Sequence, residues 1–173
     1  MAELPKLAST ARSVRRIHYK ACGAPPVPTS VCGFDIPQEF QVIGSSQEQF
    51  LQFDSGMDDE KRILIFATQS GLNDLCNFRN WATDGTFKVS PTIFYQLQTI
   101  HIHLEHTSVP RMFALLPDKK EETYDRLYTA LKDLLPEGLQ PESLGLDFEK
   151  ANLNASSNAF PMAHQSGCFF HLG

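Results

Sequence analysis

Alternating apolar and polar residues predict three consecutive strands in the middle of the chain. The runs are rich in β-branched and aromatic residues, are separated by short turn-forming segments, and cover residues 81–90, 93–105 and 108–117. In the first run, Phe87 and Val89 fall on one face and Asp84 falls on the other. Because the connections are short, we expect these strands to form an antiparallel meander.

Helical spacing predicts an amphipathic helix over residues 118–135, directly after the meander. Its apolar side chains recur at intervals of three and four residues: Tyr124, Leu127, Tyr128, Leu131, Leu134 and Leu135. Asp118, followed three residues later by Glu121, fits a capping box at the start of the helix. Pro136 and Gly138 end it.

Shorter apolar runs before and after these elements complete the predicted architecture. A strand and a short helix precede the meander, and a strand, a weak helix and a last strand follow the long helix; they cover residues 63–66, 69–78, 144–146, 149–160 and 166–173. A meander followed by alternating helices and strands predicts an α/β domain. Its mixed sheet is antiparallel in the meander and parallel beyond it, and helices pack on its faces.

The N-terminal residues 1–45 have little periodicity and contain the stretch GAPPVPTSVCG, which predicts a basic, Pro-rich arm and linker. Net charge over the chain is −5, but residues 1–33 hold five basic side chains against one acidic side chain. The remainder is acidic, which argues against a broad electrostatic surface for nucleic acid. The basic arm is able to supply a small one.

Hydropathy and cysteine usage indicate a protein that is neither secreted nor embedded in a membrane. No run of about eighteen apolar residues occurs, and the N-terminus lacks an apolar stretch of signal-peptide length. Four cysteines are widely scattered, as is typical of reduced thiols inside a cell: Cys22, Cys32, Cys76 and Cys168.

Two aspartates are candidate metal ligands. Asp147 directly follows the apolar strand at 144–146, and Asp84 lies on the polar face of the first meander strand. If these strands are neighbours, the two carboxylates meet at one end of the sheet, where they repel unless a cation lies between them. Oxygen ligands suit Mg²⁺ or Mn²⁺. The spacing alone leaves open that both acids are solvated surface caps.

His101 and His103 form a second candidate, because alternate residues of a strand point to one face and a histidine pair can bind zinc. His106 is near but lies past the end of the predicted strand, so the spacing places no third ligand. The alternative is a pair of half-exposed strand histidines.

Four stretches resemble successive blocks of the MULE (Mutator-like element) transposase domain, over roughly residues 60–173: WATDGTFKVSPTIFYQLQTIHI, VPRMFALLPDKKEETYDRLYTALKDLL, LGLDFEKA and FPMAHQSGCFFH. The resemblance implies a ribonuclease H-like fold with three acidic residues that cut and join DNA strands with divalent metal ions. Asp84 in TDGTF matches the first acid and Asp147 in LDFEKA the second. Both are therefore expected to be catalytic and to bind Mg²⁺ or Mn²⁺.

The chain also departs from the family pattern. The third acid of the family is a glutamate downstream of a C-x-x-H block, whereas this sequence stops at Gly173, so we expect the fold to be incomplete at its C-terminal end. Glu149 is interpreted as a first-turn helix acid and not as a substitute. No set of cysteines and histidines matches the FLYWCH-type zinc finger that many relatives carry at their N-terminus.

Cys168 and His171 match the C-x-x-H block of the family. Two ligands cannot make a closed zinc site, which needs four. Their role stays open between metal binding and local hydrogen bonding or DNA positioning.

Together these features predict a fragment or degenerate copy of a Mutator-like transposase, with DNA as its partner and its strand-transfer activity lost with the third acid. The alternatives are a non-catalytic, domesticated module that binds DNA or protein, and an unrelated α/β domain. The resemblance is compatible with a homo-oligomer. It implies a nuclear location, or otherwise a cytoplasmic one.

Overall fold

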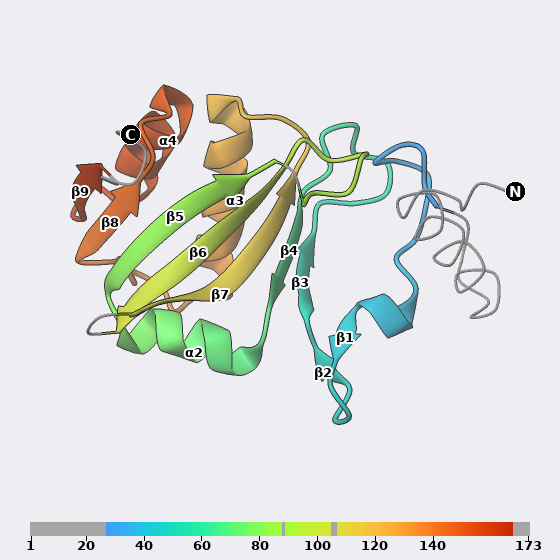
Figure 1. Cartoon of the computed structure of the whole chain (residues 1–173), viewed down its shortest axis with the longest axis horizontal. Helices are drawn as coiled ribbons and strands as arrows, with labels where there is room; N and C mark the ends of the chain where they lie inside the picture. The colour runs from blue at the N-terminus through green and yellow to red at the C-terminus, as the bar shows by residue number, and fades with distance from the viewer. Residues whose placement is uncertain (1–26, 88, 105–106, 168–173) are drawn as a thin grey trace, which may run out of the picture.

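The computed structural model describes residues 27–87, 89–104 and 107–167, which form a seven-stranded mixed sheet with three α-helices (Figure 1). The strands lie in the order β3-β4-β7-β6-β5-β8-β9. Their bounds are Leu51–Asp54 (β3), Leu64–Ala67 (β4), Asn80–Thr86 (β5), Gln96–Leu104 (β6), Thr107–Leu116 (β7), Ser143–Leu146 (β8) and His164–Gly167 (β9). The helices are α2 (Gln69–Asn77), α3 (Glu121–Leu134) and α4 (Lys150–Ala159).

The sheet combines an antiparallel meander with a parallel half, as the sequence predicts. Strands β5, β6 and β7 pair antiparallel, whereas β8 pairs parallel to β5 and β9 parallel to β8. A parallel pair needs a long crossover, which here contains the rest of the meander and α3. This mixed α/β arrangement is compatible with a ribonuclease H-like fold.

Helices α3 and α4 pack against each other, and α3 passes behind β5 and β6 in the view of Figure 1. Leu127 and Leu131 of α3 are both fully buried, which confirms that the apolar face of this helix packs into the core. Trp81 of β5 and Phe160 at the end of α4 meet edge to face, with their ring centroids 5.8 Å apart. This large core supports the middle of the sheet from one side.

The capping box predicted at the start of α3 is wrong. The helix begins at Glu121, and its N-cap residue is Lys120, which makes no side-chain cap. Asp118 lies two residues too early for that position, and its carboxylate instead accepts hydrogen bonds from the Lys120 backbone N–H at 3.0 Å and from the Thr123 hydroxyl at 2.6 Å. Asp118 therefore orders the turn before the helix.

The first meander strand is shorter than predicted, so the interpretation of Phe87 and Val89 as one face of it is wrong. Pairing with β6 ends at Thr86 opposite Leu97. Beyond this point the chain leaves the sheet, and Phe87 and Val89 are 48% and 65% exposed. Phe87 instead stacks edge-on against Tyr95 at 5.4 Å.

Residues 27–59 contribute more structure than their sequence pattern suggests. They contain a 3₁₀ turn η1 (Gln38–Phe40), a small hairpin of β1 (Val42–Ile43) and β2 (Glu48–Gln49), and the edge strand β3. Val31 and Ile36 pack against a second apolar cluster formed by Leu51, Leu64 and Phe94. The rest of the predicted arm, residues 1–26, lies outside the described part of the chain.

No helix in the described ranges is both long and apolar enough to cross a membrane.

Candidate functional site

The pairing of β5 with β8 brings the two candidate aspartates to the same level. Asn80, Trp81 and Ala82 lie opposite Ser143, Leu144 and Gly145, respectively. Continuing this register by two residues places Asp84 opposite Asp147, which follows the last residue of β8. Facing residues of neighbouring strands point to the same side and lie about 4.8 Å apart. The strand order thus puts Asp84 on β5 and Asp147 just after the end of β8, its parallel neighbour.

Asp84 is half-buried and is held by contacts to its own sheet. The Thr86 hydroxyl lies 3.4 Å from its Oδ2, and the Thr99 hydroxyl donates to its backbone carbonyl at 3.1 Å. The next residue, Gly85, packs against β6 so closely that a Cβ there would lie 3.1 Å from the Gln98 Oε1 atom. These contacts fix the backbone and leave carboxylate oxygens of Asp84 free to bind a ligand.

Asp147 has an unpaired oxygen. Its Oδ1 atom is buried and has no hydrogen-bond partner among the described residues. A buried carboxylate oxygen without a partner is costly, because it has lost its hydration and gained nothing in return. A cation bound at this oxygen would offset the cost of burying it. The chemistry of the two aspartates therefore fits a divalent ion, although two side chains are only part of the ligand set that such an ion needs.

Glu149 does not occupy the helix position that the sequence predicts. It is the N-cap residue of α4 and not a first-turn residue, and its side chain makes no cap. The Tyr124 hydroxyl instead donates a hydrogen bond to its Oε1 atom at 3.3 Å. Burial raises the pKa of Glu149, the charge of Lys119 opposes this shift, and the negative charge of Asp147 adds to it. The expected first-turn position of Glu149 is therefore wrong by one residue, although at the N-cap its charge still lies at the positive end of α4.

A complete metal site is not present within residues 27–87, 89–104 and 107–167. No three His, Cys, Asp or Glu side chains there are grouped closely enough to hold an ion. Glu149 is thus near Asp147 without joining it and Asp84 in a three-carboxylate cluster. The described residues therefore offer two candidate ligands, Asp84 and Asp147, and not a complete set.

His101 lies beside Asp84 on the neighbouring strand. Its Nε2 atom lies 2.8 Å from the Thr99 hydroxyl oxygen. Because Thr99 gives its one proton to the Asp84 carbonyl, His101 must donate from Nε2, so its buried Nδ1 is unprotonated and has no described partner. Burial lowers the pKa of His101, against the attraction of Asp84.

His103 is exposed, and the described residues complete no zinc site around this histidine pair. His106 lies outside the described residues. The interpretation of His101 and His103 as half-exposed strand histidines therefore agrees better with this geometry than a zinc site does.

The Cys168–His171 motif also lies outside the described residues. The last described residue before it, Gly167, touches the ring of Phe148, which follows Asp147 in the sequence. A Cβ at Gly167 would lie 2.5 Å from the Phe148 Cζ atom. A larger side chain at Gly167 would displace the exposed Phe148 ring, so the end of β9 lies directly against the turn that bears Asp147.

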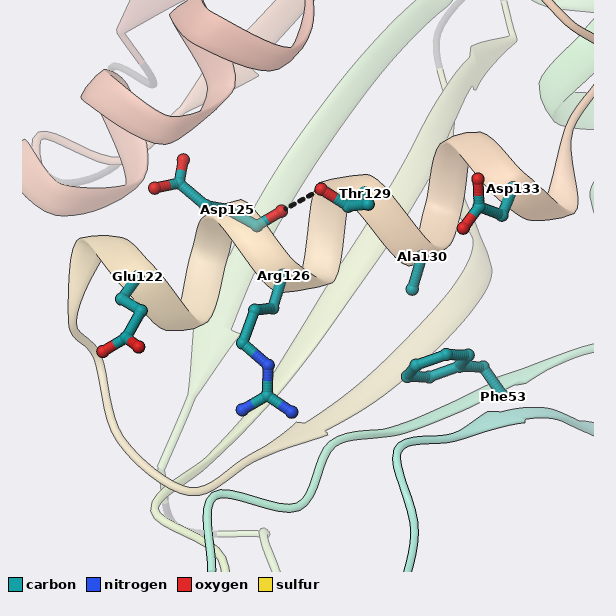
Figure 2. A pocket seen from close by; sticks show the side chains of 7 residues that line it. All are labelled: Phe53, Glu122, Asp125, Arg126, Thr129, Ala130 and Asp133. Atoms are coloured by element: carbon teal, nitrogen blue, oxygen red, sulfur yellow. Dashed lines mark hydrogen bonds between the residues drawn. The ribbon is translucent and has the colours of Figure 1, made fainter. Parts of the chain in front are cut away.

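Two surface hollows lie away from the two aspartates. One of about 370 Å³ lies between α3 and β3; it is lined by Phe53, Glu122, Asp125, Arg126, Thr129, Ala130 and Asp133 (Figure 2). Another of about 360 Å³ lies over the second apolar cluster, next to Phe34, Ile36 and Phe94. Neither of these two hollows includes Asp84 or Asp147.

Buried tyrosines near the aspartates are the part of the site that sequence reasoning missed. The sequence pattern assigns Tyr124 and Tyr128 to an apolar helix face, and both rings are indeed buried. Their hydroxyls, however, bond to Glu149 and Asn152. A buried tyrosine hydroxyl needs a partner, so two tyrosines on a core face were the available signal.

The strand order defines a mixed α/β domain that is compatible with a ribonuclease H-like fold. The family model of the MULE transposase domain matches residues 80–173, which is more than half of the chain. The chain therefore belongs to the MULE transposase domain family. No protein of curated function matches it.

Proposed function

We propose that this transposase-derived domain binds a divalent cation, Mg²⁺ or Mn²⁺, through Asp84 and Asp147, as part of a site for DNA strand cleavage and transfer. The observation that supports the proposal most strongly is the pairing of β5 with β8, because the same register, continued by two residues, would bring Asp84 level with Asp147. The unpaired Oδ1 of Asp147 adds to it. MULE transposase domains generally depend on divalent metal, and their activity implies DNA as the partner.

The two side chains have distinct tasks in this proposal. Asp84 and Asp147 hold the ion between adjacent strands, and water fills the remaining positions that octahedral coordination requires. The Thr99 hydroxyl holds the Asp84 backbone to β6, and Phe148, which follows Asp147, contacts Gly167 of β9. The bound ion would activate a water or hydroxyl and neutralise charge on a phosphodiester.

The two-metal mechanism needs a further ligand, because the second ion must be fixed where the leaving oxygen develops charge. The described residues offer no third carboxylate in a cluster with the pair. We therefore propose that this chain, assayed alone, binds the ion without catalysing strand transfer. A second copy, as in a homo-oligomer, is able to supply a further acid. Association of the protein with DNA, as proposed, implies a nuclear location.

That the described residues place no third carboxylate with the pair also favours a second candidate function, a non-catalytic module that binds DNA or protein. The two candidates differ in what they require of the aspartates. A binding module keeps its affinity for DNA or protein when Asp84 and Asp147 are replaced, whereas the metal site does not keep its affinity for the ion.

The test is a titration of the purified chain with Mn²⁺, followed by electron paramagnetic resonance. We expect one bound ion in the wild type and no binding in Asp84→Asn or Asp147→Asn. Asp125→Asn is the matched control, because Asp125 is an exposed acid on α3. Binding that survives in both site variants would overturn the proposal.

A DNA-cleavage assay with Mn²⁺ tests the second half of the proposal. We expect no cleavage by the chain alone. Robust cleavage that requires Asp84 and Asp147 would show that another acid, such as Glu149 or one from a second copy, completes the site. That result would overturn the proposed inactivity while supporting the metal site.

A further inference from the structure

Two chains of hydrogen bonds connect helix α3 to the backbone segments on either side of the candidate site. Each contains one tyrosine of α3, and each is made of side chains that are largely shielded from water. Their members come from β5, β6, α3 and the start of α4, elements that are far apart in the sequence.

The first chain runs from β6 to α4 through Tyr124. The Gln96 amide Nε2 donates to the Tyr124 hydroxyl at 2.7 Å, and this hydroxyl donates to the Glu149 Oε1 at 3.3 Å. Gln96 is 0% exposed and Tyr124 is 1% exposed, so water does not compete for these groups. The hydroxyl uses both its acceptor and its donor capacity, and thereby fixes the position of Glu149, two residues after Asp147.

The second chain runs from α3 to β5 through Tyr128. The Tyr128 hydroxyl donates to the Asn152 Oδ1, and the Asn152 Nδ2 donates to the Thr83 hydroxyl at 3.3 Å. These three residues are buried. Thr83 directly precedes Asp84, so this chain fixes the end of β5 relative to α4.

We infer that the hydroxyls of Tyr124 and Tyr128 are positioning groups for the Asp84–Asp147 pair: together they set the separation and orientation of the two acid-bearing backbone segments. The inference rests on the proposed metal site. It assigns the hydroxyls no contact with the ion or with DNA.

Electrostatics agrees with this placement. Burial is the main cause of the raised pKa values of Tyr124 and Tyr128, and the negative charge of Asp147 contributes to both. The charge of Asp147 is therefore felt at both hydroxyls. Phenylalanine would pack equally well at either position, so it is the hydrogen bonds and not the rings that distinguish these side chains from ordinary core residues.

The experiment compares Tyr124→Phe, Tyr128→Phe and Tyr95→Phe in the full chain. Tyr95 is the matched control, because it is exposed and lies outside both hydrogen-bonded chains. We expect each of the first two variants to weaken Mn²⁺ binding about tenfold, as losses of outer contacts around a metal site do. Tyr95→Phe should bind Mn²⁺ with the wild-type affinity.

Two further measurements separate positioning from general stabilisation. A melt without metal reports the loss of stability, and amide hydrogen exchange reports local opening. We expect faster exchange around Glu149 in Tyr124→Phe and around Thr83 in Tyr128→Phe, with little change in Tyr95→Phe. Variants that melt earlier but keep wild-type Mn²⁺ affinity and local exchange would overturn the inference.

The inference and the proposed function fail in different ways. A wild type that binds no Mn²⁺ at Asp84 and Asp147 overturns the metal site, and the positioning of its ligands falls with it. If the wild type binds Mn²⁺ and both tyrosine variants bind it with the same affinity, only the positioning role is overturned.

Discussion

Two partly buried carboxylates, Asp54 at the edge of the sheet and Asp147 at the candidate site, have opposite surroundings. The guanidinium of Arg62 binds both oxygens of Asp54, at 2.8 Å and 2.5 Å, and the Gly56 backbone N–H adds a bond at 2.9 Å. Asp147 has an unpartnered buried oxygen and lies opposite another aspartate. The sequence alone shows an acid in both places.

The difference separates a structural acid from a candidate functional one. Arg62 is only 1% exposed and also donates to the carbonyls of Val31 and Phe34, so its charge and its donors are satisfied within the protein. A closed, bidentate pair of this kind needs no further ligand. The buried oxygen of Asp147 does, because an acceptor shielded from water and left without a partner is costly.

Removal of Arg62 should have the largest effect on stability. Arg62→Ala leaves the Asp54 carboxylate without its counter-charge and two carbonyls without donors, so we expect a loss of about 3–5 kcal/mol in the free energy of unfolding. Urea denaturation measures it. Lys119→Ala, an exposed cation, is the control and should change stability by less than about 0.5 kcal/mol. A loss below about 1 kcal/mol for Arg62→Ala would mean that the pair is not a structural bond.

The two aspartates should respond with opposite signs to the same substitution. Asp54→Asn breaks a satisfied ion pair and should cost about 1–3 kcal/mol. Asp147→Asn removes a negative charge from a buried, unpartnered group and should stabilise the metal-free chain by about 0.5–2 kcal/mol, as substitutions at functional sites often do. Parallel denaturation of both variants checks this. Destabilisation by Asp147→Asn in the absence of metal would contradict the contrast.

Acid should affect the two regions in opposite directions, with the smallest effects. Hydrogen bonds from Arg62 and Gly56 lower the pKa of Asp54 although burial opposes them, so its contribution is present above the ordinary value of 3.8 and is lost as pH falls through the lowered value. The pKa of Glu149 is raised, so its contribution is present below the ordinary value of 4.5 and is lost as pH rises through the raised value.

The measurement is the free energy of unfolding of the wild type and Glu149→Gln between about pH 7 and about pH 3. Near neutral pH the variant should be the more stable of the two, because it lacks the buried negative charge. The two curves should converge on acidification. A constant difference across this range would show that the Glu149 carboxyl does not titrate abnormally.

Much of the fold follows from local patterns in the sequence. Alternation in the meander and the periodicity of Leu127 and Leu131 depend only on neighbouring residues, and these elements are confirmed. The same patterns, with the resemblance to a known family, led to the expectation that the strands of Asp84 and Asp147 are neighbours, which the pairing of β5 with β8 satisfies. The catalytic and metal-binding roles of the two aspartates stay predictions.

What sequence patterns did not reveal depends on distant partners. Arg62 belongs to the charged stretch DDEKR, whose spacing indicates no partner, yet its side chain bonds to Val31, Phe34 and Asp54. Glu149 lies at the start of α4, and its sequence position does not show that the hydroxyl of Tyr124, on another helix, donates a hydrogen bond to it. Local spacing contains no information about contacts of this kind.

The register of β5 and β8 also has a consequence for how the chain folds. Paired residues such as Asn80 and Ser143 are separated by two strands and a helix, so their contact closes a long loop, which is a slow and entropically costly step. The two aspartates are therefore far apart in any state that lacks this pairing. An ion that requires both of them binds the native topology and not the unfolded chain, and it raises the native population by mass action. Mn²⁺ affinity would thus report whether the crossover has formed, independently of any reaction on DNA.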